Sequence, residues 1–228
     1  MKPDTAQGII PIDAIPALNR VPKVTADFWL IKLMAVTMGE TAADYLAVNL
    51  GLGLTATSLL MTAILIGALV VQFGQKRYVP WAYWLTVVLI SIVGTLVTDN
   101  LVDKFGVSLI ATTVSFTLAL AATFALWFAS ENTLSIHAIF TTEREAYYWL
   151  AILFTFALGT AAGDLVAEKF GLGYLATGIL FGMIIASLAF GYFALKLDPV
   201  LGFWLAYIFT VSVRGDRSAE GLERRLVS

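Results

Sequence analysis

The amino-acid sequence predicts an all-α polytopic membrane protein, with seven transmembrane helices built from parallel helix-turn-helix repeats. First, 59% of the 228 residues are apolar and only 13% are charged, whereas soluble domains contain roughly 45–50% apolar and about 25% charged residues. Second, apolar runs long enough to cross roughly 30 Å of hydrocarbon alternate with short polar or glycine turns. Third, every second run repeats one motif.

The charge and the lack of cysteine exclude several classes of protein. A net charge of −2 offers no basic surface to nucleic acid, and a chain without cysteine has no disulfide scaffold. With one histidine and no thiol, the common zinc, haem-thiolate and iron–sulfur sites lose their ligands. No nucleophile elbow, paired-histidine zinc motif or phosphate-binding loop is present, so we expect neither an enzyme nor a cofactor.

The apolar runs are expected to be helices because unpaired backbone groups are too costly in lipid, and the alternating ten-residue strands of a barrel are absent. Four prolines interrupt residues 1–27, which we interpret as an extended N-terminal arm. A membrane domain at 28–214 and a charged tail at 215–228 follow. The seven helices are placed at about 28–48, 54–74, 81–102, 107–129, 147–168, 172–195 and 199–214.

The connections differ between the two sides of the membrane. Glycine turns close the first, third and fifth helices, and charged loops lie on the opposite side, the longest being 130–146. The short loops contain four lysine and arginine residues on the N-terminal side of the membrane and two on the other side. This difference favours a cytoplasmic N-terminus. Tryptophans near the helix starts on this side predict an interfacial belt without a catalytic role: Trp29, Trp81, Trp84, Trp149 and Trp204.

The repeat is the strongest signal in the sequence. Copies begin near residues 28, 83, 148 and 203, and in the first three a glycine follows the tryptophan after ten residues and an aspartate after fifteen. Each copy is one helix plus the helix that returns the chain, so all copies enter the membrane from the same side. Equivalent residues should therefore lie at equal depth.

Equal depth places Asp44, Asp99 and Asp164 at one level, about 22 Å from the tryptophans at 1.5 Å per residue. An ionised aspartate facing lipid there costs on the order of 1–3 kcal/mol, so we expect these side chains to point inward. Glu40 lies one turn before Asp44 on the same stripe. The supporting polar residues are Thr41, Thr95, Thr160, Asn100, Asp103 and Glu168.

The fourth copy departs from the pattern. Arg214 stands where the other copies have glycine, and Ala219 stands where they have aspartate. Arg214 is expected to lean into the aspartate level as a fixed counter-charge. The alternative is that its side chain extends to the membrane interface.

An oxygen-rich acidic cluster without cysteine suits hard cations such as protons, Na⁺, Mg²⁺, Ca²⁺ or Mn²⁺. The first hypothesis is a small secondary transporter, an exporter or exchanger with protons as a coupling ion, in which Glu40, Asp44, Asp99 and Asp164 bind the cation or proton, including a metal. The alternatives are a cation channel with an acidic ring and a non-transporting scaffold or partner subunit. The ion, the direction of transport and the oligomeric state are left open by the sequence.

The motifs GETAADYL, GTLVTDNL and GTAAGDLVAE, with GLGLTAT and GLGYLAT, resemble those of a family of uncharacterised bacterial integral membrane proteins described as membrane-anchored. The resemblance covers the chain from Val21 to the seventh helix. It implies a multi-pass protein of the bacterial inner membrane and brings no activity or substrate. The repeated acid-bearing helices are also loosely similar to manganese exporters, at the level of architecture only.

Overall fold

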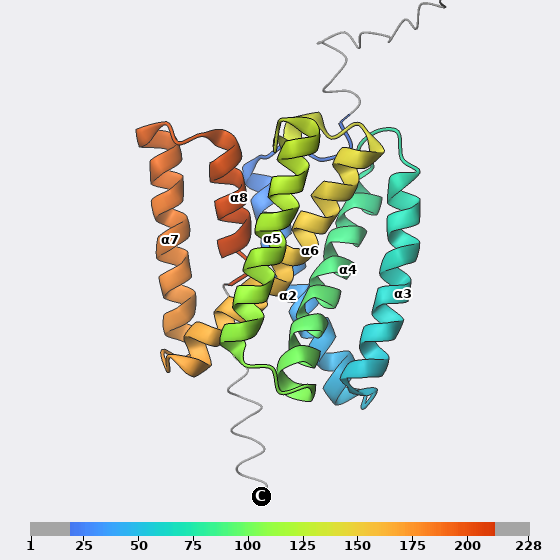
Figure 1. Cartoon of the computed structure of the whole chain (residues 1–228), viewed down its shortest axis with the longest axis vertical. Helices are drawn as coiled ribbons and strands as arrows, with labels where there is room; N and C mark the ends of the chain where they lie inside the picture. The colour runs from blue at the N-terminus through green and yellow to red at the C-terminus, as the bar shows by residue number, and fades with distance from the viewer. Residues whose placement is uncertain (1–18, 213–228) are drawn as a thin grey trace, which may run out of the picture.

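The computed structural model describes residues 19–212, and every regular element in that part of the chain is a helix. Figure 1 shows the helices running roughly side by side along one direction. The seven α-helices are α2 (Ala26–Asp44), α3 (Gly53–Phe73), α4 (Pro80–Asp99), α5 (Leu109–Glu131), α6 (Thr142–Asp164), α7 (Tyr174–Leu195) and α8 (Pro199–Phe209). The short elements are the π turns η2 (Tyr45–Asn49), η3 (Asn100–Lys104) and η5 (Leu165–Lys169), and the 3₁₀ turn η4 (Ile136–Ala138).

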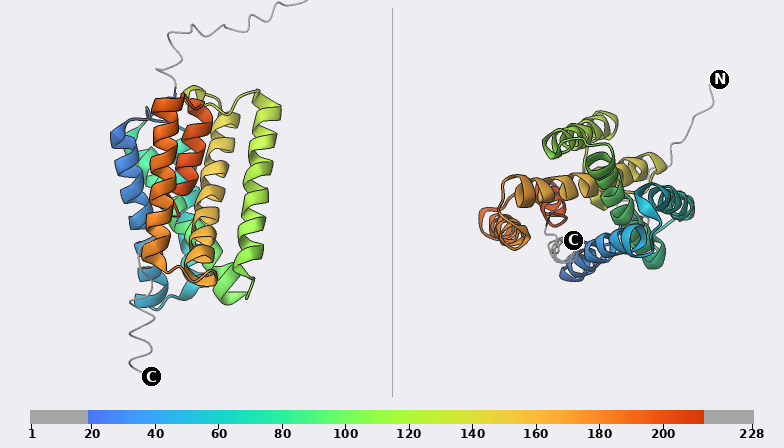
Figure 2. Two further views of the ribbon diagram at one scale, coloured as in Figure 1. Left: turned by 90° about the vertical axis from the view of Figure 1, so that its left-hand side faces the viewer. Right: turned by 90° about the horizontal axis from the view of Figure 1, so that it is seen from below.

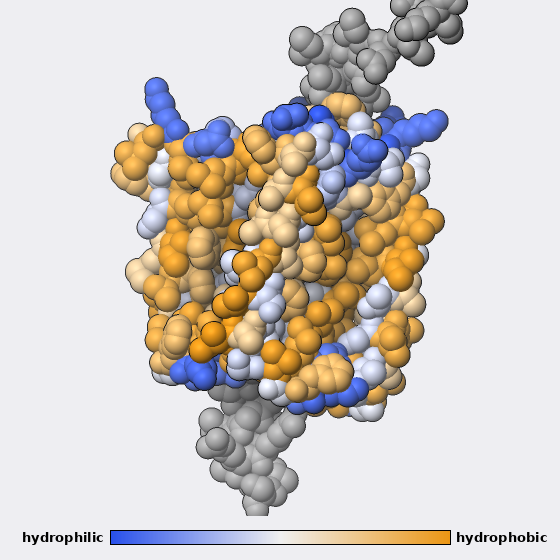
Figure 3. Space-filling model, viewed as in Figure 1, coloured by the Kyte–Doolittle hydropathy of each residue, from blue (hydrophilic) through white to orange (hydrophobic). Residues whose placement is uncertain are grey.

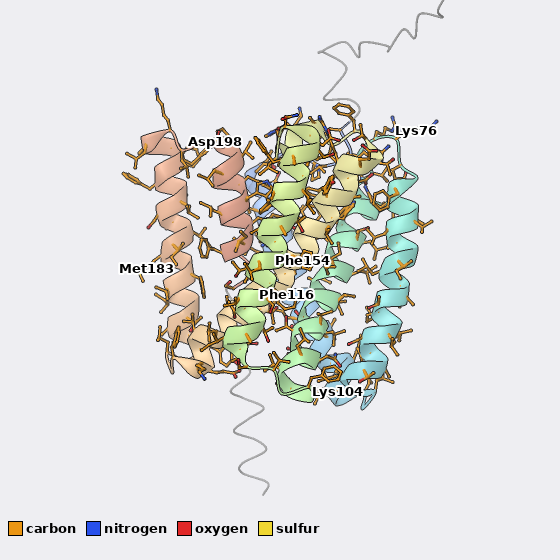
Figure 4. All side chains as sticks on the ribbon, viewed as in Figure 1. Lys76, Lys104, Phe116, Phe154, Met183 and Asp198 are labelled. Carbon is orange, nitrogen blue, oxygen red and sulfur yellow. The ribbon has the colours of Figure 1, made fainter. Side chains whose placement is uncertain are left out.

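Five spans are long and apolar enough to cross a membrane: those of α3, α4, α5, α6 and α7. On the face shown in Figure 3, apolar residues cover the middle of the molecule and charged residues gather at its two ends. Figure 4 places Lys76 and Asp198 at one end and Lys104 at the other, with Met183 projecting away from α7 between them. The chain is a multi-pass, all-α membrane protein.

Two expected helix boundaries are wrong. α6 begins at Thr142 because the Thr141 side chain accepts a hydrogen bond from the Arg144 amide at 3.2 Å and caps the helix before its apolar run begins. The seventh helix was expected over 199–214, but α8 ends at Phe209. Its 11 residues span about 16 Å, roughly half of the hydrocarbon thickness.

The helices form an inner and an outer set. α2, α4, α6 and α8 surround a common axis, while α3, α5 and α7 lie outside them (Figure 2). The inner helices pack closely, because each repeated glycine meets the next inner helix or, for Gly159, the residues that directly follow α8. A Cβ atom at Gly39 would lie 1.7 Å from Ser91 Oγ. The other two repeated glycines are equally close to their neighbours. An added Cβ would lie 2.7 Å from Phe156 Cβ at Gly94 and 2.5 Å from Val211 Cβ at Gly159.

Aromatic contacts close this inner set into a ring at one end. In each contact, the first aromatic residue of one copy meets the tryptophan of the next copy, and the fourth copy returns to the first. The ring-centroid distances are 5.6 Å for Phe28–Trp84, 5.3 Å for Tyr83–Trp149, 6.1 Å for Tyr148–Trp204 and 5.7 Å for Phe203–Trp29. The four inner helices therefore have a quasi-four-fold arrangement, and we call these eight residues the aromatic ring.

The expected tryptophan belt is largely wrong for this reason. Trp149 and Trp204 are only 3% and 4% exposed, since they pack inside the aromatic ring. Trp29 and Trp84 are half-buried in the same ring. Trp81, 60% exposed, faces outward as an interfacial tryptophan would.

Candidate functional site

Each candidate aspartate stands where its helix changes from α to π geometry. α2 ends at Asp44, α4 at Asp99 and α6 at Asp164, and a five-residue π turn follows each of them. The glycine after each turn has a φ of 68°, 68° and 72°, a left-handed conformation that glycine adopts without strain. π turns are rare and are frequent at functional sites. Because this irregularity recurs at equivalent residues, it is a property of the repeat.

Three of the four acidic candidates are buried. Asp99 and Asp164 are each 4% exposed and Glu40 is 7% exposed, while Asp44 is half-buried. These side chains therefore lie mainly against protein, as the cost of charge in lipid demands. We call the level of Asp44, Asp99 and Asp164 the carboxylate level.

Equivalent hydroxyl groups meet one turn before the carboxylate level. Thr95 Oγ1 and Thr160 Oγ1 lie 3.3 Å apart across the α4–α6 interface. Thr98 Oγ1 donates a hydrogen bond to the Ala157 carbonyl at 3.0 Å. α4 and α6 therefore lie in register here, and their equivalent residues share one depth.

The other supporting residues are not brought into this buried set. Thr41, Asp103 and Glu168 are exposed, and Glu168 accepts a hydrogen bond from the Tyr174 hydroxyl. Asn100 is half-buried, and its Nδ2 donates to Ser58 Oγ at 2.8 Å, which ties η3 to α3. Arg214 lies outside the described residues, as do the tail at 215–228 and most of the N-terminal arm.

Within residues 19–212, no group of three or more histidine, aspartate or glutamate side chains is assembled that could hold a metal ion. The helices that carry the four acidic candidates, α2, α4 and α6, are distributed around the inner axis (Figure 2).

Sequence reasoning missed a buried lysine inside the inner set. Lys32 on α2 is fully buried, and its Nζ donates hydrogen bonds to the Tyr207 carbonyl at 3.1 Å and to Thr210 Oγ1. Nζ also lies 4.5 Å from the centroid of the Tyr207 ring. The only signal in the sequence is a lysine in a stripe where the other copies have apolar or aromatic residues.

A second missed group lies near the aromatic ring, at the start of α6. Glu145 is fully buried and pairs with Arg20 at 2.5 Å. Its Oε1 accepts hydrogen bonds from Gln72 Nε2 at 2.8 Å and Trp149 Nε1 at 3.3 Å. The sequence placed Glu145 in a polar loop and gave no sign of this network, because the partners Gln72 and Arg20 are 73 and 125 residues away.

In the loop between α3 and α4, the phenol of Tyr78 has a raised pKa. Trp84 Nε1 donates a hydrogen bond to the Tyr78 hydroxyl at 3.1 Å. Partial burial raises the pKa of Tyr78 above its ordinary value, and the hydrogen bond from Trp84 opposes that shift. Tyr78 is thus a neutral hydrogen-bonding group at physiological pH.

A family model described as "Repeat of Unknown Function (DUF347)" matches residues 28–78, 82–133 and 147–197. The chain belongs to this repeat family. Each DUF347 repeat holds one inner helix and the outer helix that follows it: α2 with α3, α4 with α5, and α6 with α7. No curated protein and no solved structure matches the chain.

The three matched DUF347 repeats agree with the first three copies expected from the sequence, and α8 lies outside them. The fourth inner helix therefore completes the aromatic ring without being a matched repeat. Because each repeat ends its inner helix with an aspartate and a π turn, the carboxylate level belongs to the three DUF347 repeats alone.

Proposed function

We propose that this protein is a small secondary transporter for a hard cation, with protons as the coupling ion, and that the ion path follows the axis of α2, α4, α6 and α8. The observation that carries the proposal is the repeated aspartate at the α-to-π junction of three inner helices. Ionisable groups inside a membrane bundle are costly and usually line ion or proton paths.

The arrangement favours a monovalent cation or a proton over a divalent metal. Divalent ions such as Ca²⁺ and Mg²⁺ favour several carboxylate ligands at one point, and the described residues assemble no group of three acids. A single carboxylate with neutral oxygens suits Na⁺ or a proton better. Thr95 and Thr160 supply such hydroxyl oxygens one turn from Asp99 and Asp164.

The difference between the two ends of the inner axis favours a carrier over a channel. The aromatic ring fills the inner set at one end, and the carboxylate level lies toward the other end. A path closed on one side fits alternating access, in which each side opens in turn. The quasi-four-fold ring of inner helices favours one other candidate, a cation channel along the same axis.

Ion flux into liposomes that contain the purified protein tests the proposal. We expect saturable, proton-coupled uptake of a monovalent cation, and a loss of at least about tenfold in Asp99→Asn and in Asp164→Asn, since each removes a charge at the carboxylate level. Asp103→Asn is the matched control because Asp103 is exposed on η3, four residues after Asp99.

Wild-type flux in both Asp99→Asn and Asp164→Asn would reject the carboxylate level as the ion path. Single-channel currents in place of saturable uptake would assign the channel function. An absence of flux for every cation tried would leave a scaffold or partner subunit, in which the acids brace the repeats.

A further inference from the structure

α8 stops inside the bundle. Its last α-helical residue, Phe209, is equivalent to positions that lie ten residues before the carboxylate level in the other inner helices: Met34, Leu89 and Phe154. The last carbonyl groups of a helix lack intrahelical donors and carry partial negative charge. At the end of α8, the Thr210 hydroxyl donates to the Tyr207 carbonyl at 3.0 Å and the Val211 amide donates to the Ile208 carbonyl at 3.2 Å.

Lys32 adds a further donor to this helix end. Its ammonium group donates to the Tyr207 carbonyl at 3.1 Å and to the Thr210 hydroxyl, which are neutral oxygens at the end of α8. The Tyr207 and Phe156 rings lie 4.5 and 5.7 Å from Nζ. A carbonyl at a helix C-terminus, a hydroxyl and two aromatic faces all attract a small cation.

The packing of the inner helices does not by itself require a lysine at this position. The equivalent residues in the other copies are fully buried and uncharged: Val87, Ile152 and Tyr207. The lysine occurs only in the copy that faces the shortened helix. Glu40 lies eight residues further along α2, about 12 Å away by helical rise.

We infer that the end of α8 is a binding site for a small monovalent cation of the ammonium class, and that the Lys32 ammonium fills it here as a tethered ligand. A free ammonium or alkylammonium ion has the same charge and the same N–H donors as the lysine head group. It therefore binds the Tyr207 carbonyl and the Thr210 hydroxyl when the Lys32 head group is removed. This site goes beyond the proposed transport function, since it lies apart from the carboxylate level and requires no flux.

Chemical rescue of Lys32→Ala tests the site. We expect the variant to melt at a lower temperature than the wild type, because a buried hydrogen-bonding group is lost and a cavity is left. Methylammonium chloride should raise its melting temperature by about 3–6 °C at ten times the dissociation constant. Choline chloride has the same charge without N–H donors, and it should give no such rise.

Val87→Ala is the matched control because Val87 occupies the equivalent buried position. Neither this variant nor the wild type, whose site is filled by Lys32, should respond to methylammonium. Equal responses of Lys32→Ala and Val87→Ala, or no response of Lys32→Ala to methylammonium, would overturn the inference.

If Lys32→Ala does not fold, the yield of monodisperse protein extracted in each salt replaces the melting temperature. Recovery with methylammonium alone supports the site, and recovery with both salts or with neither overturns it. Because these readouts measure binding, they succeed or fail independently of the flux experiments.

Discussion

The inner helices α4 and α6 and the outer helices α3, α5 and α7 are all long and apolar enough to span a membrane, and they differ in almost everything else. Inside the bundle, 67% of the α4 and α6 spans is buried, against 17%, 22% and 6% for α3, α5 and α7. The inner glycines meet neighbouring helices, whereas Gly67, Gly178 and Gly182 on the outer helices have open space around them. The buried charged residues of the described chain are Lys32, Glu40, Asp99, Glu145 and Asp164, all on inner helices.

This difference separates two roles of hydrophobicity. The outer helices present apolar side chains to lipid and tolerate loose packing. The inner helices use apolar and small residues to hold ionisable groups within a membrane. The chemistry of the protein is therefore to be sought along the inner axis, and matched substitutions on the two sets of helices test that separation.

The largest expected effect is at the aromatic ring. Trp204→Ala should reduce stability by about 3–5 kcal/mol, because the side chain is buried and its Nε1 bond to the Leu134 carbonyl, 3.1 Å long, is lost. Trp81→Ala should change stability by less than about 0.5 kcal/mol, since Trp81 is 60% exposed. Melting temperatures in detergent measure both. Equal losses would mean that the aromatic ring does not hold the inner helices together.

Two ion pairs that differ in burial give the next comparison. The loss of stability at the buried pair should nearly equal that of Trp204→Ala. Arg20→Met leaves the buried Glu145 carboxylate without its cation and should cost about 3–5 kcal/mol. Arg144→Met removes the partner of Glu131 at the end of α5 and should cost about 1 kcal/mol or less, because that pair is more exposed. Urea unfolding in mixed micelles compares the two variants. A larger loss for Arg144→Met would contradict the burial of the Arg20–Glu145 pair.

The smallest expected changes in stability have opposite signs on the inner and outer helices. Gly94→Ala should destabilise by about 1–3 kcal/mol, because its Cβ would lie 2.7 Å from Phe156 Cβ. Gly182→Ala on α7 meets nothing within 4 Å and should stabilise by up to about 1 kcal/mol through higher helix propensity. Opposite shifts in melting temperature are expected. A gain for both variants would show that the inner helices are less tightly packed than described.

The sequence predicted what depends on local pattern. Helix positions followed from apolar runs, and the common level of Asp99 and Asp164 followed from same-sense repeats, whose register is seen in the Thr95–Thr160 contact. The start of α6 was misplaced because Thr141 caps the helix before its apolar run begins.

Features that depend on distant contacts were not predictable. Trp204 was expected at the membrane interface, but rings from other helices bury it: Phe124, Trp127 and Tyr148. The end of α8 and the role of Lys32 depend on a hydrogen bond between residues 175 positions apart. The sequence analysis continued each inner helix through its π turn as regular helix, so the local geometry of the carboxylate level was also missed.

Carbodiimide labelling of the membrane-embedded protein tests most directly whether the acids of the inner helices form an ion site. The reagent modifies protonated carboxyl groups within membranes, and mass spectrometry of the digested chain locates the adducts. The account predicts adducts on Asp99 or Asp164 that diminish as Li⁺, Na⁺ or K⁺ is raised to saturation, because the bound cation displaces the proton. Labelling of these residues that no cation changes, or its complete absence at every pH where the protein is folded, would contradict the account.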